Sequence, residues 1–406
     1  GDEIITIDGI PVKDKSKSVI RDLLTGQSGT SVLLEVNRLS VGRLKKEIIQ
    51  SGGSISFSLL MDIVLYDEEH GYYTGYKEQF GESGDFITAP MISNIFARCF
   101  LNSFKENFVH LPSSILELGG GNGQFAVDLL IAAEKNNILI DRYLIYEISN
   151  NLVKRQQKIM QKELSNEFFS KVEWVSEVPE KFEGIIFANE FLDAFPTNIY
   201  EIKNKQIFER KVGIENNQLD WKEDDKPNLE LAGIIDTENL PTGYIFEYSK
   251  NLDEWLNKFF KIIKKAMIFF VDYGFCQNEL FHQDRTEGTL MCHYKHYAHT
   301  NPFAFLGAQD ITWHINFSHI SRLAKIAGCT VSGFVSQANF LINAGALDFL
   351  SEHDPNNISD FKIQTNAFQR LTSPAEMGDL IKVIGIVKNT DASLFGFNKN
   401  DRKLQL

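Results

Sequence analysis

A glycine-rich turn preceded by an acidic residue is the strongest chemical signal in the sequence. An apolar run at 114–118 contains Glu117 and leads into Gly119, Gly121 and Gly123, after which a helical pattern begins. Glycines at such a turn let the backbone approach a ligand closely. A dinucleotide site would show GxGxxG with pyrophosphate at the helix N-terminus, whereas the spacing here is ExGxGxG. The pattern favours a nucleoside ligand that has a cationic end and no phosphate; the alternative is a purely structural turn.

A second acidic residue stands where a ribose could be bound. Glu147 ends the next apolar run, 143–147, and one carboxylate can accept hydrogen bonds from both ribose hydroxyls. Together the two acids and the turn resemble the first motif of class I S-adenosylmethionine-dependent methyltransferases, whose cofactor has a sulfonium and an amino-acid end. The expected cofactor is S-adenosyl-L-methionine. Its candidate binding residues here are Glu117, Gly119, Gly121, Gly123 and Glu147.

Two further carboxylates follow the apolar run 185–188. Asn189, Glu190 and Asp193 come directly after it, and ligands of open α/β sheets lie beyond the carboxyl ends of the strands. Two fixed carboxylates could hold a planar guanidinium and aim one nitrogen at a sulfonium methyl group. We therefore predict Asn189 as a cofactor residue and Glu190 and Asp193 as catalytic residues. The alternative is that one of the acids caps a following helix.

Three weaker candidates come from separate segments. Asp85 and Thr88 could bind the amino-acid end of the cofactor, or they could form a turn or a helix cap. His314 could receive or relay the proton that an arginine nitrogen loses, and it is the third predicted catalytic residue. A structural histidine is the alternative for that position.

No metal site is expected. Cys292, His293, His296 and His299 lie close together in the sequence, but a spacing of three does not keep three imidazoles on one face of a strand. The 4 cysteines are far apart and contain no CxxC pair, so neither zinc nor disulfides are implied.

The composition excludes several classes of protein. The chain has 406 residues, 43% of them hydrophobic and 23% charged, which is typical of a folded globular protein. A formal net charge of -13 argues against binding nucleic acid over a broad surface. No apolar run approaches the roughly 20 residues of a membrane helix, and no leader is recognisable.

Apolar strand-like runs alternate with helical stretches, which predicts an α/β fold with a largely parallel, Rossmann-like sheet. We expect a domain over 40–406 that has a helical cover at 40–112 and a β-rich insertion at about 197–250. Seven strands are expected, at 114–118, 143–147, 172–175, 185–188, 266–272, 331–335 and 382–387.

Residues 1–39 form a separate segment. The stretch GDEIITIDG at 1–9 and the segment 26–38 resemble the C-terminal half of a protease-type PDZ domain. The peptide-binding strand and the carboxylate loop of such a domain would precede Gly1. We therefore expect a partial, structural appendage.

The domain over 40–406 resembles the MidA-like methyltransferases. The matching stretches are LYDEEHGYY (65–73), FGESGDFITAP (80–90), LELGGGNGQ (116–124), ANEFLDAFP (188–196), VDYGF (271–275), GTLMCHYKHYAHTNPF (288–303), GAQDITWHINF (307–317) and LTSPAEMGDLIKV (371–383). The resemblance implies a class I methyltransferase fold and a protein arginine as acceptor, which in the best-known member lies on a respiratory complex I subunit. Met91 and Asn316 stand where the family tends to have acidic residues, and either could change substrate handling.

The resemblance leads to one principal hypothesis: methyl transfer from S-adenosyl-L-methionine to an arginine nitrogen of a protein partner. A small-molecule methyltransferase and a non-catalytic assembly factor that binds the cofactor are the alternatives. The compartment would be the cytoplasm for a bacterial protein and the mitochondrial matrix for a eukaryotic one. The oligomeric state does not follow from the sequence.

Overall fold

A mixed β-sheet forms the centre of the chain in the computed structural model, which describes residues 3–7, 10–11, 34–37, 39–75 and 87–406. The seven main strands are β5 (Ser114–Leu118), β6 (Arg142–Tyr146), β7 (Val172–Val175), β8 (Glu183–Asn189), β13 (Lys265–Phe275), β18 (Thr330–Ser336) and β19 (Ile381–Lys388). Their order is β18-β19-β13-β8-β5-β6-β7, and the short β17 (Ile315–Asn316) pairs with β13. Only β19 runs antiparallel to its neighbours among these seven. The predicted α/β fold with seven strands is confirmed.

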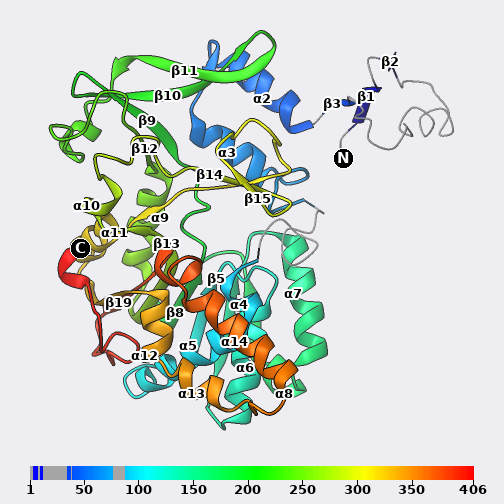
Figure 1. Ribbon diagram of the computed structural model, residues 1–406, viewed down its shortest axis with the longest axis vertical. Helices are drawn as coiled ribbons and strands as arrows, with labels where there is room; N and C mark the ends of the chain where they lie inside the picture. The colour runs from blue at the N-terminus through cyan, green and yellow to red at the C-terminus, as the bar shows by residue number, and fades with distance from the viewer. Residues whose placement is uncertain (1–2, 8–9, 12–33, 38, 76–86) are drawn as a thin grey trace.

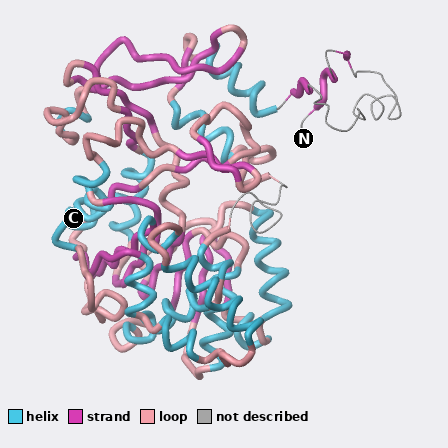
Figure 2. The backbone as a smooth tube through the Cα atoms, viewed as in Figure 1, coloured by secondary structure: helices cyan, strands magenta, loops and turns pink. Residues whose placement is uncertain are grey.

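Both faces of this sheet are covered by helices (Figures 1 and 2). Alternate residues of a strand point to opposite faces, so Ile185 and Phe187 pack in one core while Ile186 and Ala188 pack in the other. The first core includes α5 (Ile95–Asn107), α6 (Gln124–Lys135), α12 (Gln337–Asn343) and α13 (Ala346–Ser351). The second core includes α3 (Phe57–Tyr66), α9 (Lys250–Ile262) and α11 (Phe317–Ile326). Burial on both faces explains why the strands are continuous apolar runs in the sequence.

A β-rich layer lies above the sheet in Figure 1. One of its sheets has the order β11-β10-β9-β12, with β4 (Ser54–Ile55) paired to β10. Its strands are β9 (Asn198–Lys203), β10 (Gln206–Glu215), β11 (Gln218–Pro227) and β12 (Ile245–Tyr248). A smaller sheet contains β14 (Met291–Tyr294), β15 (Tyr297–His299) and β16 (Asp310–Thr312).

The helices of 40–112 divide between the two layers. The helices α2 (Leu39–Gln50) and α3 contact β10 of the upper layer, whereas α4 (Ala89–Ile92) and α5 contact α6 beside the main sheet. This division places Asp62 and Tyr66 of α3 above the carboxyl ends of the main strands. Helices of this segment therefore lie on both sides of the space between the upper layer and the main sheet.

Five further helices and two 3-10 turns are described. They are α7 (Asn150–Glu163), α8 (Asn166–Phe169), α10 (Gln277–Leu280), α14 (Ile358–Thr372), α15 (Met377–Leu380) and the 3-10 turns Leu231–Gly233 and Lys403–Gln405. No helix in the described part of the chain is long and apolar enough to cross a membrane.

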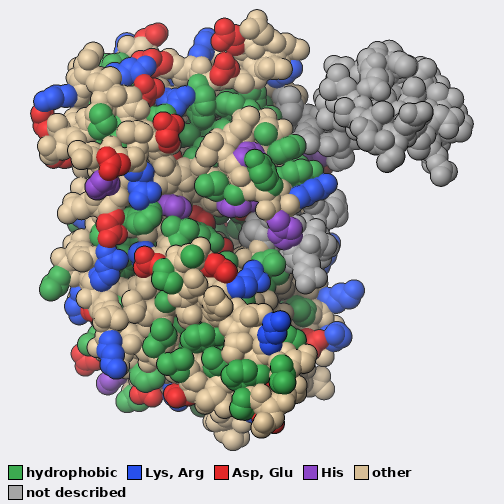
Figure 3. Space-filling model, viewed as in Figure 1, with side chains coloured by type: hydrophobic (Ala, Val, Ile, Leu, Met, Phe, Trp, Pro, Cys, Tyr) green, Lys and Arg blue, Asp and Glu red, His purple; other side chains and the backbone are tan. Residues whose placement is uncertain are grey.

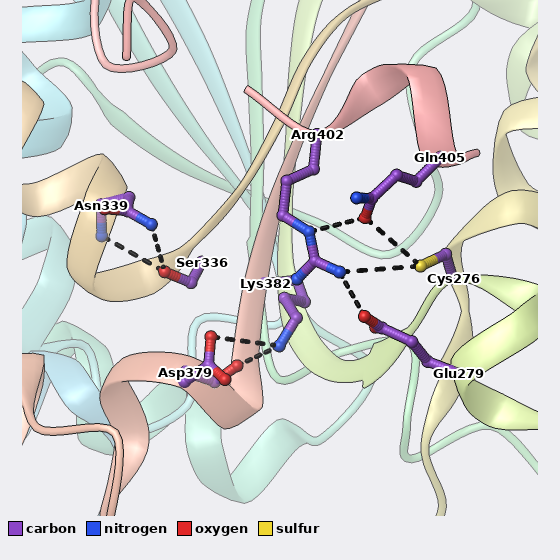
Figure 4. A network of polar contacts seen from close by, with 8 residues as sticks. All are labelled: Cys276, Glu279, Ser336, Asn339, Asp379, Lys382, Arg402 and Gln405. Carbon is purple, nitrogen blue, oxygen red and sulfur yellow. Dashed lines mark hydrogen bonds and ion pairs between the residues drawn. The ribbon is translucent and has the colours of Figure 1, made fainter. Parts of the chain in front are cut away.

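The two ends of the chain differ in their contacts. The C-terminal segment returns to the sheet: the Arg402 backbone N–H donates to the Phe334 carbonyl oxygen at 2.7 Å, and the Arg402 guanidinium pairs with Glu279 beside Cys276 (Figure 4). At the N-terminus, β1 (Glu3–Ile7) pairs with β2 (Ile10–Pro11) and β3 (Leu34–Asn37). Residues 12–33 lie outside the described residues, and the PDZ resemblance stays a prediction.

Candidate active site

A cavity of about 450 Å³ lies between the two layers. Its floor is formed at the carboxyl ends of β5, β6, β8 and β13, and its roof includes residues of α3, β14 and β16. Figure 3 shows histidine side chains in the band between the upper and lower parts of the molecule. The cavity thus lies at the carboxyl ends of the strands, where ligands of open α/β sheets are predicted to bind.

The glycine turn forms one wall of this cavity. Gly119 has φ +73°, and a Cβ atom there would lie 2.9 Å from the ring of Phe191. Both facts require glycine, because a side chain would strain the backbone and close the wall. Gly123 has φ +87° and stands at the N-cap of α6, where its N–H donates to the Gly120 carbonyl oxygen at 2.8 Å.

Two acids flank the turn: Glu117 is buried and Glu147 is half-buried. Glu117 accepts a hydrogen bond from the Tyr143 hydroxyl at 2.8 Å, and burial raises its pKa to about 8. Glu147 accepts from the Ser149 N–H at 3.0 Å and from the side-chain amide of Gln156 at 3.1 Å, and burial raises its pKa to about 7. A cationic or hydroxyl-bearing ligand would stabilise both carboxylates in their charged form.

Gln156 ties these parts together. It is fully buried on α7, its side-chain amide also donates to the Gly121 carbonyl oxygen at 2.9 Å, and its side-chain oxygen accepts from Trp174 at 2.9 Å. Sequence reasoning missed this residue, because a glutamine within an amphipathic helix has no distinguishing local pattern.

The turn after β8 has an unusual backbone. Glu190 has φ +49°, and its N–H donates to the Val271 carbonyl oxygen at 2.8 Å. The Glu190 carboxylate accepts from the Asn189 side chain at 3.0 Å and from the Ala89 backbone N–H. Because a non-glycine residue at positive φ costs energy, this geometry is typical of a functional position. The next element along the chain is the strand β9, so neither Glu190 nor Asp193 caps a following helix, and that alternative was wrong. The Ala89 N–H that Glu190 accepts belongs to the first residue of α4, which comes earlier in the chain.

Asp272 on β13 holds this turn from below. Its Oδ2 atom accepts the backbone N–H groups of Phe191, Leu192 and Asp193 at 3.1, 2.8 and 3.4 Å. Burial raises the pKa of Asp272 to about 7. Burial, followed by the charge of Asp272, raises the pKa of Glu190 to about 8 and that of Asp193 well above its usual range.

The roof adds a further carboxylate and two tyrosines. Asp310 of β16 is 3% exposed and accepts from the Tyr73 hydroxyl at 2.7 Å and from the Ile311 backbone N–H at 2.9 Å. The Tyr66 hydroxyl donates to the Ala194 carbonyl oxygen at 2.7 Å. Asp272, Asp310 and Tyr73 had not been predicted as site residues, although all three lie within the motifs that carry the family resemblance.

Most of the predicted residues line the cavity. Those that do are Thr88, Glu117, Gly119, Gly121, Glu147, Asn189, Glu190 and Asp193. Thr88 is the N-cap of α4, but its side chain makes no capping hydrogen bond. Gly123 is outside the lining and shapes the turn, and Asp85 lies outside the described residues.

His314 stands behind the cavity and does not line it. Its ring stacks on Tyr273, a lining residue, with 6.1 Å between ring centroids. Burial, followed by the charges of Arg285 and Lys382, lowers the pKa of His314 to about 4. The imidazole is therefore neutral at pH 7, and His314 could influence the reacting atoms only through its contact with Tyr273.

The histidine-rich segment separates into different surroundings. His293 lines the cavity, His296 lies at the hairpin turn with φ +62°, and His299 is paired with Cys292 across β14 and β15. No group of three or more His, Cys, Asp or Glu side chains in the described ranges is arranged to hold a metal ion. Asn316 is one of the two residues that stand where the family tends to have an acidic residue. Its side chain accepts a hydrogen bond from the His319 N–H at 3.1 Å as the N-cap of α11.

The charge of the cavity fits S-adenosyl-L-methionine. The described lining residues include six carboxylates, Asp62, Glu117, Glu147, Glu190, Asp193 and Asp310, and contain no lysine or arginine. Glu117, Asp193 and Asp310 are buried, and buried acids with no lysine or arginine beside them in the lining favour a positively charged ligand. The sulfonium and ammonium groups of the cofactor would lie beside the glycine turn, and its ribose would lie at Glu147.

A family model described as "Putative S-adenosyl-L-methionine-dependent methyltransferase" matches residues 95–335. The chain is 34% identical to a COG1565 superfamily member from Burkholderia thailandensis that was crystallised with S-adenosyl-homocysteine. That structure superposes with a TM-score of 0.86 over 90% of this chain and 96% of the other. A native structure of a COG1565 superfamily protein from the same organism has a TM-score of 0.84, 35% identity and the same coverage.

Curated relatives are more distant. Protein arginine methyltransferase NDUFAF7 of Homo sapiens, a mitochondrial protein, is 24% identical over 400 residues, covering 87% of this chain and 85% of that protein. Its Drosophila melanogaster homologue is 23% identical over 390 residues, with 85% of each chain covered.

Proposed function

The chain belongs to this family of S-adenosyl-L-methionine-dependent methyltransferases, and from that premise we propose that its acceptor is a guanidinium nitrogen of an arginine in a protein. The cofactor is S-adenosyl-L-methionine. The observation that carries the proposal is a pair of carboxylates that line the cavity, the half-buried Glu190 and the buried Asp193, on a turn that the buried carboxylate of Asp272 holds in place. The names of the curated relatives support the same acceptor.

The cavity is suited to a guanidinium because that group is a permanent cation with five N–H donors in one plane. Glu190 and Asp193 line the same wall of the cavity and can accept several of these donors. Burial strengthens each such contact, because the surroundings screen charge poorly. A neutral acceptor would leave these carboxylates without compensation.

When bound, the cofactor supplies a methyl group made electrophilic by its sulfonium centre. The protein has to orient one guanidinium nitrogen in line with that group, with reacting atoms about 3 to 3.5 Å apart. A new N–C bond forms as the S–C bond breaks, and the nitrogen then loses one proton. Glu190, whose pKa is raised to about 8, is suited to receive that proton.

The direct test combines labelling with one isosteric variant. The purified chain and methyl-labelled cofactor are incubated with a bacterial extract and, separately, with respiratory complex I, and the label is located by mass spectrometry. We expect label on arginine in a protein. Glu190→Gln should retain S-adenosyl-homocysteine binding within about threefold and reduce methyl transfer at least about a hundredfold, as loss of a positioned acid–base group does.

Glu254→Gln is the matched control, because Glu254 is an exposed glutamate on α9 outside the cavity. It should behave as the unmodified chain does. Label found only on small molecules, or full activity in Glu190→Gln, would overturn the proposal. Unchanged support of partner assembly by an inactive variant would favour a scaffolding role.

The acceptor partner and compartment form the finer part of the proposal. The resemblance seen in the sequence makes a respiratory complex I subunit the first acceptor to test, and the curated relatives are mitochondrial proteins. Methylation of a complex I subunit in a membrane extract, at a single arginine, is the expected result.

A further inference from the structure

The cavity receives carboxylates from two separate layers of the fold. Glu190 and Asp193 belong to the turn after β8, whereas Asp310 belongs to β16 in the small sheet of the roof. The Tyr73 hydroxyl donates to Asp310 Oδ1 at 2.7 Å, and the Ile311 N–H donates to the same atom at 2.9 Å. Asp310 is therefore fixed in orientation while it faces the cavity.

The neighbours of Asp310 assign it to one half of the cavity. Its charge contributes to the raised pKa values of Glu190, Asp193 and Tyr273, at the ends of β8 and β13. It does not contribute to those of Glu117 and Glu147, at the ends of β5 and β6. The contacts place it on the same side: the ring of Tyr73, which bonds to Asp310, stacks on Tyr66 with 5.6 Å between centroids, and the Tyr66 hydroxyl donates to the carbonyl oxygen of Ala194, the residue after Asp193. Asp310 is thus linked to the turn that carries the acids expected to bind the acceptor.

We infer that Asp310, oriented by Tyr73, is a specificity-determining residue that binds the acceptor guanidinium from the roof, opposite Glu190 and Asp193. This inference rests on the proposed function and extends it to the substrate-binding role of the upper layer. A guanidinium can donate along several directions in one plane, so carboxylates on two sides can be satisfied together. An ammonium group has three donors at one point and lacks this planar arrangement of donors.

Two hydrogen bonds attach the roof to the turn after β8. The Trp313 indole N–H, three residues after Asp310, donates to the Phe195 carbonyl oxygen at 2.9 Å, and the Tyr66 hydroxyl donates to the carbonyl oxygen of Ala194 at 2.7 Å. These bonds join the roof to the turn that carries Glu190 and Asp193. The carboxylates of the two layers are thereby held in one frame.

The test compares Asp310→Asn and Tyr73→Phe with the unmodified 406-residue chain. Methyl transfer is measured on a glycine–serine peptide with a single arginine and on the counterpart with lysine, and S-adenosyl-homocysteine affinity and Tm are measured in parallel. Asp310→Asn should raise KM for the arginine peptide at least about tenfold, the loss of one charge-assisted hydrogen bond. Its kcat and its affinity for S-adenosyl-homocysteine should change less than about threefold.

Tyr73→Phe keeps the ring and removes only the hydroxyl donor, so it should raise the same KM about threefold to tenfold. Tyr248→Phe is the matched control: the Tyr248 hydroxyl donates to Asp253 at 2.5 Å, and neither residue lines the cavity. It should leave KM and kcat unchanged. If Asp310→Asn does not fold, the Tyr73→Phe and Tyr248→Phe pair decides the question.

Three results would overturn the inference. They are an unchanged KM in both site variants, a loss of cofactor affinity in place of a KM effect, and an equal loss in Tyr248→Phe. Absence of arginine methylation by the unmodified chain would instead refute the proposed function itself, so the two failures are distinguishable.

Discussion

Asp272 of β13 accepts the backbone N–H of Leu192 at 2.8 Å, so the strand next to β8 fixes the turn that carries Glu190 and Asp193. The same oxygen accepts the N–H groups of Phe191 and Asp193. Asp272 is therefore a positioning residue: it affects the reaction by holding the turn that carries Glu190 and Asp193.

Asp272→Asn should weaken this support. An amide has one acceptor oxygen and no charge, and each buried N–H left without a partner costs about 1 to 3 kcal/mol. We expect a lower Tm and a kcat reduced at least about tenfold, with S-adenosyl-homocysteine affinity retained because the glycine turn lies on β5. Loss of cofactor affinity with unchanged kcat would contradict this role.

The activity should depend on pH through the buried acids. Burial raises the pKa of Glu190 to about 8, so the carboxylate is largely protonated at pH 7 and ionises as the pH rises. Ionised Glu190 is the form that holds a guanidinium and accepts a proton. We expect kcat/KM for the acceptor to rise about tenfold per pH unit below about pH 8 and to level above it.

The charge of Asp272 contributes to the raised pKa of Glu190, so an Asp272 variant tests whether Glu190 controls the pH profile. In Asp272→Asn the midpoint of the profile should move to lower pH. A flat profile between pH 6 and 9 in the unmodified chain would show that no group with a raised pKa controls the reaction.

Gly119→Ala should weaken cofactor binding. The added methyl group would lie 2.9 Å from the Phe191 ring, at a residue with φ +73°. Gly328→Ala is the matched control, because Gly328 has φ +78° and no atom within 4 Å of the added Cβ. Both variants carry the backbone cost of about 1 kcal/mol; only Gly119→Ala should lose S-adenosyl-homocysteine affinity, by at least about tenfold in a calorimetric titration.

Glu117→Gln should raise the thermal stability of the protein at high pH and weaken its binding of S-adenosyl-homocysteine. Burial raises the Glu117 pKa from the ordinary 4.5 to about 8. The folded state thus holds a proton that the unfolded state has lost between these values, and stability falls as the pH rises from about 4.5 to about 8. The variant removes this titration, so its Tm should exceed that of the unmodified chain by a few degrees at pH 9.

The same variant should bind S-adenosyl-homocysteine at least about tenfold more weakly, because the carboxylate facing the cationic end of the ligand is lost. Glu254→Gln serves as the control for both measurements, since that side chain is exposed. Equal Tm values for Glu117→Gln and the unmodified chain across pH 5 to 9 would contradict the raised pKa of Glu117.

The sequence alone determined the main sheet and the local motifs. Largely buried strands appear as mostly apolar runs, so β5 was predicted with the bounds that the structure has, Ser114–Leu118. The edge strand β7, Val172–Val175, was also predicted with its observed bounds, although its Glu173 is exposed. The glycine turn and the Asn189–Glu190 pair were recognisable because each lies directly after one such strand. These features depend on neighbours in the chain, which a sequence displays.

The tertiary structure alone decided which distant groups complete the site. Asp272 contacts a turn some 80 residues earlier, and Tyr73 bonds to Asp310 across 237 positions. His314, a catalytic candidate from the sequence, stacks on Tyr273 and does not line the cavity, while Asp310 from the same segment does. Such contacts depend on how the layers pack, because burial and hydrogen bonding between remote segments leave no periodic pattern in either one.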